Sequence, residues 1–263
     1  MTEAAIGAVS HEAAYRVRFD EAGADGRLRT SGLLRYTQDL AARHSEALGY
    51  DRAWYSERGL TWLVRTAEIG IAAPIRYGAD VVGTTRVIGF RRVWSRREST
   101  FRIGPDLAAV VRIDWVLLDA RGAPTRIPSE FEAFCRSSGP SAGLQLGRVT
   151  LGEPPAESHR RTITVRPHEL DPLDHVNNAV YADWVDEAVL ATAGEEGAAV
   201  VRGLPRRVRL EFALAAEPLE ELETVTWRDD GGWSCAVRRA SDAADLLRAR
   251  IEPAGKLVET RGV

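Results

Sequence analysis

Lysine and asparagine are nearly absent from this 263-residue chain. Lys256 is the only lysine among 35 basic residues, and the only two asparagines, Asn177 and Asn178, are adjacent. A bias against both residue types is typical of a GC-rich genome and has a mutational rather than a physical cause. The two asparagines nevertheless stand together just after His175, and this segment therefore becomes a candidate functional site.

Cysteine and long apolar runs are scarce as well. Cys135 and Cys235 lie far apart without a CxxC spacing, which argues against a disulfide scaffold, a zinc site or an iron–sulfur cluster. No apolar run approaches the roughly 18 residues that a membrane span needs. The N-terminal residues lack the basic start and the long apolar stretch of a signal peptide. We therefore expect a cytoplasmic protein without metal or redox cofactor.

Positive charge is not in excess, since the net charge is -3. This balance excludes a basic nucleic-acid binder as the first interpretation. Arginine is nevertheless clustered at residues 91–97 and 206–209. These clusters are interpreted either as solvated strand faces or as a surface that receives an anionic partner.

Hydrophobic periodicity predicts an α+β fold. Residues 15–19 alternate like a half-buried strand, and apolar residues at helical spacing predict a long helix over 31–49 that ends at Gly49. Four runs of strand-like sequence follow that helix, with breaks at Pro74 and at residues 77–80 and a turn at 119–122. They comprise residues 60–72, 79–90, 92–103 and 108–119.

The chain also repeats itself. A shift of 148 residues aligns 14–19 with 162–167 and Glu21 with Glu169, and a slightly different shift aligns the segments that begin at Glu68 and Glu211. The repeat predicts a tandem duplication with a first domain over 1–135, a linker over 136–160 and a second domain over 161–263. Two such units can pair their sheets edge to edge as an internal pseudo-dimer, because pairing removes exposed sheet edges.

Chemistry-bearing residues gather between a strand and the second long helix, over residues 168–187. Asn177 and Asn178 lie at the expected helix start, where asparagine caps free backbone N–H groups. The same helix start, with its dipole, is suited to a developing oxyanion. Asp171, four residues before His175, makes a workable acid–base or nucleophile pair. The segment thus has the groups needed to transfer an acyl group to water.

The run from Asp171 to Tyr181, DPLDHVNNAVY, resembles the D-x-x-x-H-V-N-N-x-x-Y signature of hotdog-fold thioesterases. The tandem arrangement narrows the resemblance to the acyl-ACP thioesterases of plants and bacteria. Matching first-half features are the helix near residues 33–44, the Arg-Arg-Glu at 96–98 and the Ile-Pro at 127–128. The resemblance covers roughly residues 15–252 and implies a double hotdog fold, with two long helices each wrapped by an antiparallel sheet.

By this resemblance, Asp171 polarises or attacks the thioester or activates water, His175 assists proton transfer, and Asn177 positions water or the carbonyl. Asn178 belongs to the substrate-binding set. The implied partner is an acyl carrier protein, whose pantetheine arm enters between the two copies beside the arginine clusters. The implied reaction releases a free fatty acid, and the first domain supplies the acyl pocket.

The sequence departs from this pattern in both halves. Leu173 replaces an asparagine and fits the D-P-L-G-H pattern of acyl-CoA thioesterases, with Asp174 in place of the glycine. Ala215 and Ala216 stand where the plant enzymes carry Glu-Cys. In the first copy the chemical groups are missing, and the positions equivalent to Asp171, His175 and the two asparagines hold Gly23, Arg27 and the pair Arg29-Thr30.

Several alternatives remain open at this stage. The aspartates around Pro172 also suit a turn, His175 also suits a loop, and the asparagines also suit caps alone. Asp39 and Glu187 are expected in surface salt bridges, Gln38 and His44 in helix packing, the tryptophans in the core or on sheet faces, and Cys235 as a buried hydrophobe. Rival functions are an acyl-CoA thioesterase and a non-catalytic acyl-thioester binder, and the chain is expected as a monomer or a homodimer.

Overall fold

The computed structural model describes residues 10–131 and 145–255. Its first half contains β1 (Ser10–Arg16), the 3-10 helix η1 (Phe19–Glu21), α2 (Thr30–Ala47), α3 (Arg52–Glu57), β2 (Thr61–Ile71), β3 (Asp80–Arg91), β4 (Trp94–Ile103) and β5 (Asp106–Leu118). Its second half contains β6 (His159–Thr164), the 3-10 helix η2 (Pro167–Glu169), α5 (Asn178–Arg202), β7 (Arg206–Phe212), β8 (Glu221–Asp229), β9 (Gly232–Arg239) and β10 (Asp245–Pro253).

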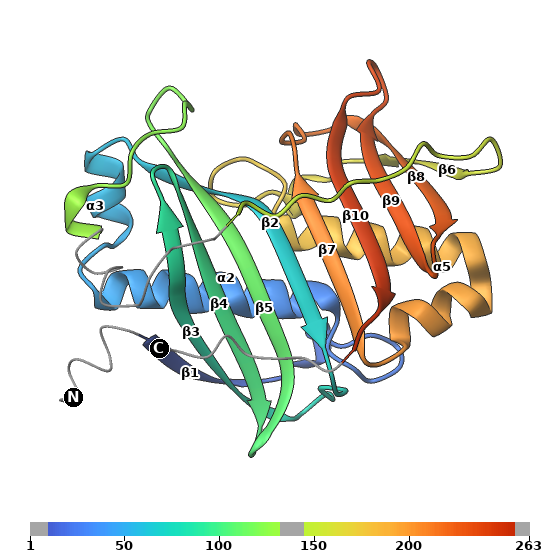
Figure 1. Ribbon diagram of the computed structural model, residues 1–263, viewed down its shortest axis with the longest axis horizontal. Coiled ribbons are helices and arrows are strands. Elements are labelled where there is room, and N and C mark those ends of the chain that lie inside the picture. Colours follow the sequence, from blue (N-terminus) through green and yellow to red (C-terminus); the bar gives the residue numbers. More distant parts are fainter. Residues whose placement is uncertain (1–9, 132–144, 256–263) are drawn as a thin grey trace.

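These strands form one ten-stranded antiparallel sheet, and both long helices pack against the same face of it (Figure 1). The strand order is β1-β3-β4-β5-β2-β7-β10-β9-β8-β6, so each half contributes five strands in the same internal order. The predicted α+β class and the double hotdog fold are confirmed. No helix in the described ranges combines the length and apolarity needed to cross a membrane.

The predicted elements match closely except at the N-terminal strand. The alternation at 15–19 predicts a strand there, whereas β1 spans Ser10–Arg16, and Phe19 is 83% exposed in η1. The last residue pair between β1 and β3 is Arg16 with Asp80, after which the chain turns toward α2. The predicted helix end is confirmed, since the Gly49 N–H donates to Glu46 O at 2.9 Å with a φ of 85°.

The two halves are joined by antiparallel pairing of β2 with β7. Ala67 pairs with Leu210, and these two residues are equivalent under the second of the sequence shifts. On the helical layer, Arg35 Nη2 lies 3.4 Å from Asp183 Oδ2, and these residues are equivalent under the 148-residue shift. A pair of equivalent residues in contact lies on the symmetry axis, so a pseudo-twofold axis passes through both layers.

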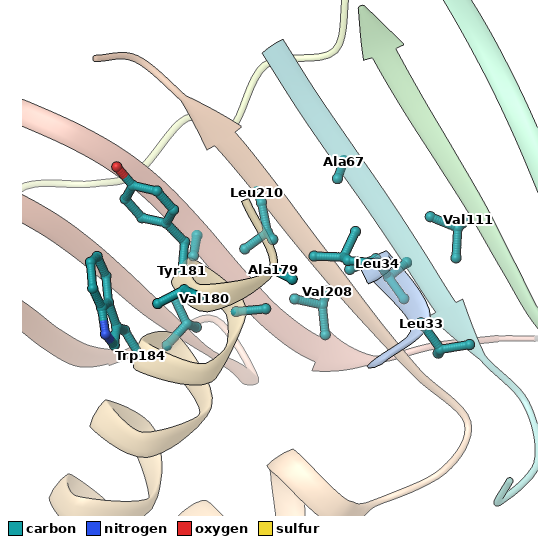
Figure 2. Packing of buried hydrophobic residues seen from close by; sticks show 14 of the residues in the cluster. Leu33, Leu34, Ala67, Val111, Ala179, Val180, Tyr181, Trp184, Val208 and Leu210 are labelled. Atoms are coloured by element: carbon teal, nitrogen blue, oxygen red, sulfur yellow. The ribbon is translucent and has the colours of Figure 1, made fainter. Parts of the chain in front are cut away.

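One apolar core spans this axis. Figure 2 shows Leu34 of α2 and Ala179 of α5 converging on Ala67 and Leu210 of the two central strands. Leu210 is fully buried. Because buried apolar area drives folding, the shared core makes the two halves one folding unit.

The described part of the predicted linker crosses the outer face of the sheet, opposite the long helices (Figure 1). The Gly147 N–H donates to Asp114 Oδ2 at 3.0 Å, and the Val149 N–H donates to Glu211 Oε2 at 2.8 Å. Both carboxylates are almost completely buried, and Arg96 and Arg65 respectively bind them from the sheet. The segment is therefore fastened to both halves of the sheet, and its end from His159 onward belongs to β6.

Truncation at the axis is expected to destabilise the whole chain. Leu210→Ala removes a fully buried side chain and leaves a cavity, which costs about 2–5 kcal/mol of unfolding free energy. The matched control is Leu214→Ala, because Leu214 is 48% exposed. Urea unfolding followed by circular dichroism measures both, and equal midpoints for the two variants would contradict a shared core.

Candidate active site

The loop before α5 is a tight turn built around Asp171. The Asp171 N–H donates to His175 O at 2.7 Å, and the Asp174 N–H donates to Asp171 O at 2.9 Å. The Asp171 carboxylate accepts the Leu173 N–H through Oδ1 at 2.8 Å. Asp174 has a φ of 61°, the left-handed conformation that glycine favours and aspartate tolerates. Asp171 and Asp174 do serve as turn residues, as one open interpretation has it.

Glu169 fastens this loop to the helix that follows. Its backbone oxygen accepts the Asn177 N–H at 2.9 Å, and its carboxylate accepts the Arg166 N–H at 2.7 Å and the Trp184 indole N–H at 3.2 Å. From the sequence, Glu169 is only the repeat equivalent of Glu21 and is not among the predicted site residues. Its signal was present in the repeat alignment, because Glu21 occupies the equivalent position.

The two asparagines form the start of α5. Asn177 is the N-cap, and its Oδ1 accepts the Ala179 N–H at 2.9 Å. The Val180 N–H donates to Asn177 O at 2.8 Å. Among the described contacts, the Asn178 N–H has no acceptor, and the Asn177 side-chain N–H2 group donates no hydrogen bond. A free backbone donor therefore lies at the positive end of the helix dipole, as an oxyanion site requires.

The predicted site residues share one loop and one helix start. Asp171 and both asparagines are partly buried, and His175 is exposed. Asp171 and His175 are joined through their backbones, and no hydrogen bond between their side chains occurs in the described structure. Their catalytic roles stay predictions.

The first half builds the same turn with different side chains. The Gly23 N–H donates to Arg27 O at 2.8 Å, the Gly26 N–H donates to Gly23 O at 2.9 Å, and Gly26 has a φ of 71°. Glu21 again anchors the loop, since its backbone oxygen accepts the Arg29 N–H at 3.1 Å. Arg29 is the N-cap of α2 and provides no side-chain cap. The backbone frame is thus duplicated, while the carboxylate at the Asp171 position, the histidine and the two asparagines have no counterpart at the equivalent positions of the first half.

The strand end that would carry a second acid lies beside the start of α5. The Ala216 N–H donates to the Tyr181 hydroxyl oxygen at 3.1 Å. Burial raises the pKa of Tyr181 to about 12, so its hydroxyl stays neutral. Ala215 is exposed, and the Glu217 N–H is turned back onto the Glu220 carboxylate at 2.9 Å.

An apolar cavity of about 230 Å³ lies between α2 and the first half of the sheet. Its helical wall includes Gln38, Ala41 and Ser45, and its sheet wall includes Trp62 and Trp115. Two of the tryptophans expected as packing residues therefore face a cavity. Sequence periodicity places them on strands but does not reveal which strand positions a helix leaves uncovered.

Pseudo-symmetry relates this cavity to the α5 start. Thr30 Oγ1 donates to Asp186 Oδ2 at 2.9 Å across the axis. Asn178 and Gln38 are the respective equivalents of Thr30 and Asp186 under the 148-residue shift. We therefore infer that Gln38, on the cavity wall, faces Asn178 at the start of α5.

Most arginines of the two clusters have partners inside the protein. Arg96 forms two hydrogen bonds with Asp114, Arg97 contacts His44 Nδ1 at 2.7 Å, and Arg206 is buried. Arg207 and Arg209 bind Glu252. The expectation of solvated strand faces is wrong for Arg206, and an anionic partner would find most of the cluster already paired.

Other expectations for single residues are confirmed. Arg43 Nε lies 2.8 Å from Asp39 Oδ2, and Arg161 Nη1 lies 2.8 Å from Glu187 Oε1, so both acids form salt bridges. Cys235 is a free, buried thiol. Cys135 lies outside the described residues. No cluster of three or more metal-binding side chains is found within the ranges 10–131 and 145–255.

Comparison with known proteins identifies the family. The family model for the acyl-ACP thioesterase N-terminal domain matches residues 8–134, and that for the C-terminal domain matches residues 152–199. The chain belongs to the acyl-ACP thioesterase family. The resemblance stated from sequence motifs is confirmed.

Two relatives and two solved structures illustrate the similarity. The chloroplastic palmitoyl-acyl carrier protein thioesterase of Arabidopsis thaliana is 23% identical over 94% of this chain and 64% of its own length. A namesake from Cuphea hookeriana is 25% identical over 90% of this chain and 60% of its own length, so this chain spans less than two thirds of either relative. A putative oleoyl thioesterase of Lactobacillus plantarum has a TM-score of 0.79 at 19% identity, covering 92% of this chain and 94% of that one. The 12:0-ACP thioesterase of Umbellularia californica has a TM-score of 0.72 at 18% identity, covering 92% of this chain and 96% of that one.

Substitutions at Asn177 separate its role as the helix N-cap from its predicted role in catalysis. Asn177→Asp keeps an acceptor for the Ala179 N–H and removes the side-chain N–H2 group. For Asn177→Asp we expect unchanged thermal stability and a loss of thioester hydrolysis. Asn177→Ala removes both the cap acceptor and the N–H2 group, so it should also lose hydrolysis and cost about 1 kcal/mol of stability. Thermal melts and thioesterase assays measure these effects. Wild-type hydrolysis by Asn177→Asp would show that the residue is only a cap.

Proposed function

We propose that this protein hydrolyses acyl thioesters of acyl carrier protein and releases free fatty acids, so that it ends fatty acid synthesis. The observation that carries the proposal is the apolar cavity against α2, whose wall includes Gln38. The Thr30–Asp186 contact, through the pseudo-symmetry, supports a position of Gln38 facing the start of α5. A hydrocarbon chain fits such a wall, because burial of apolar surface is favourable. The scissile carbonyl then lies where the loop from Asp171 to Asn177 holds its polar groups.

The proposed chemistry is the attack of water, or of Asp171 itself, on the thioester carbonyl carbon. In the first case Asp171 accepts a proton from water, the oxyanion forms at the free Asn178 N–H, and the C–S bond then breaks. His175 assists the proton transfer that yields the leaving thiol. Asn177 positions the water or the carbonyl through its free side-chain N–H2 group. In the second case the Asp171 carboxylate attacks the carbonyl carbon, the C–S bond breaks and the thiol leaves, and water then hydrolyses the acyl-enzyme anhydride.

The difference between the two loops supports the second half as the location of the catalytic site. Its loop holds Asp171 and His175, whereas the equivalent first-half positions are Gly23 and Arg27 on the same backbone turn. A glycine cannot exchange protons, and an arginine stays protonated at all working pH values. One catalytic centre per chain follows, with the first half supplying the acyl pocket.

The carrier protein is the proposed partner, with its pantetheine arm entering between the two halves. The exposed, unpaired Arg91 and Arg92 are candidates for contact with an acidic carrier, since the described structure gives neither an ion pair. We propose a cytoplasmic protein that acts as a monomer or a homodimer.

Removal of the Asp171 charge tests the site assignment. Asp171→Asn keeps an oxygen that accepts the Leu173 N–H and so preserves the turn. Because general acid–base catalysis contributes about 10²–10⁴-fold, we expect hydrolysis of acyl-ACP to fall by at least about 100-fold. Asp174→Asn is the matched control, since it makes the same change in the same turn at an exposed position. If both variants keep wild-type kcat, Asp171 is a turn residue and the site lies elsewhere.

Carrier preference tests the substrate. One acyl chain is presented on acyl carrier protein and on coenzyme A, and kcat/KM is measured for both. We expect a higher value with the carrier protein and a reduced value for the double variant Arg91→Gln/Arg92→Gln on that substrate alone. A higher value with coenzyme A would favour the acyl-CoA thioesterase alternative. Tight acyl-chain binding without turnover of either substrate would favour the non-catalytic binder.

A further inference from the structure

A second cavity, of about 680 Å³, lies across the pseudo-twofold axis from the first. Asp186 and Leu190 of α5 line it, and their equivalents Gln38 and Ala42 line the first cavity. It opens beside the start of α2, which is the equivalent of the candidate catalytic centre. The duplication has therefore produced two related cavities, and the chemistry proposed above uses one of them.

The second cavity is bounded by the part of α5 that follows a kink. α5 is interrupted at Gly194, where φ is 52° and ψ is -120°, and the helical segment after this kink turns back (Figure 1). That segment brings Val201 and Arg202 to the cavity wall, and Leu204 follows them. The volume lies within the range of about 300–1,000 Å³ that small-molecule sites occupy.

Positive charge exceeds negative charge on the wall of this cavity. Five arginines line it, and they are Arg27, Arg29, Arg166, Arg202 and Arg206. Of the four acidic residues that line it, Asp183 and Glu187 are bound by arginines outside the wall, at 3.4 Å and 2.8 Å. Only Asp25 and Asp186 remain to compensate five guanidinium groups.

Arg206 is the innermost of these cations. It is 8% exposed, its Nη2 donates to Thr30 Oγ1 at 3.3 Å, and its Nε has no hydrogen-bond partner among the described residues. Burial lowers the pKa of Arg206 and raises the pKa of Asp186 to about 6, since desolvation disfavours both charges, while each charge acts against the other's shift. A buried cation with an unused donor favours an anion as its missing partner.

The rest of the wall is apolar. Leu33 of α2, Ile71 at the end of β2, Ile75 and Leu190 face the same space. A small inorganic anion would leave this surface uncovered, whereas a hydrocarbon chain would cover it. The cavity wall thus has a guanidinium group at one place and an apolar surface over much of the rest.

We propose that the second cavity binds a fatty carboxylate, with its carboxylate on Arg206 and its chain along the apolar wall. The site is distinct from the candidate catalytic centre, because its loop carries Gly23 and Arg27 in place of Asp171 and His175. It requires no turnover, and its occupancy is measured independently of thioester hydrolysis.

Photo-crosslinking tests this site in the full chain. Dodecanoate with a diazirine on its terminal carbon labels the protein, and mass spectrometry maps the label. We expect label on the residues lining the second cavity, and displacement by unmodified dodecanoate but not by equal concentrations of acetate or inorganic phosphate. Label confined to the α2 wall of the first cavity would overturn the proposal. Equal displacement by acetate or phosphate would also overturn it, since the site would then bind any small oxyanion.

Variants give the second arm of the test. Arg206→Gln/Asp186→Asn removes both buried charges together, and we expect at least about a tenfold loss of labelling at the second cavity. The matched control is Arg121→Gln, because Arg121 is exposed and Asp119 is its ion-pair partner among the described residues. If the double variant fails to fold by circular dichroism, Arg202→Gln at the exposed rim replaces it. Undiminished labelling in a folded variant would contradict the assigned carboxylate position.

Discussion

The pairing of β2 with β7 is the constraint from which the rest of the molecule follows. It merges two five-stranded sheets into one and fixes their register at Ala67 and Leu210. With that register set, the helices on the sheet must overlap near their first turns, where Arg35 meets Asp183. Each helix start then faces the middle of the other helix. A loop in one half can therefore share a site with a cavity in the other, which neither half could build alone.

Duplication preserved the backbone and freed the side chains to diverge. Both loops keep a glutamate that ties the turn to its helix, Glu21 in one half and Glu169 in the other. Both keep a left-handed residue, as glycine in the first and as Asp174 in the second. Since the same backbone hydrogen bonds hold both turns, several of their side chains differ between the two halves. Reactive groups on one side of the axis and arginines on the other are two outcomes of the same frame.

Much of this architecture could be predicted because it depends on local sequence patterns. Helix and strand periodicity place the long helix and the four following strands of the first half within two residues, and the repeat at Glu21 and Glu169 locates both helix starts. What failed depends on partners distant in sequence. The end of β1 is set by the extent of β3, and several clustered arginines pair with acids such as Asp114 and Glu252 on neighbouring strands. The cavity wall at Trp62 and Trp115 likewise depends on how α2 crosses the sheet.

The contacts around the start of α5 narrow the proposed acid–base chemistry by elimination. The Glu169 carboxylate is held by a backbone N–H and the Trp184 indole, and Asp183 and Glu187 are each paired with an arginine. Tyr181 stays protonated because burial raises its pKa, so it is no base at neutral pH. Ala215, which stands where the plant enzymes carry a glutamate, offers no second acid. The carboxylate of Asp171 keeps one oxygen free of described hydrogen bonds, and the exposed His175 belongs to the same turn. The proton transfer proposed at this helix start therefore rests on Asp171, His175 and water.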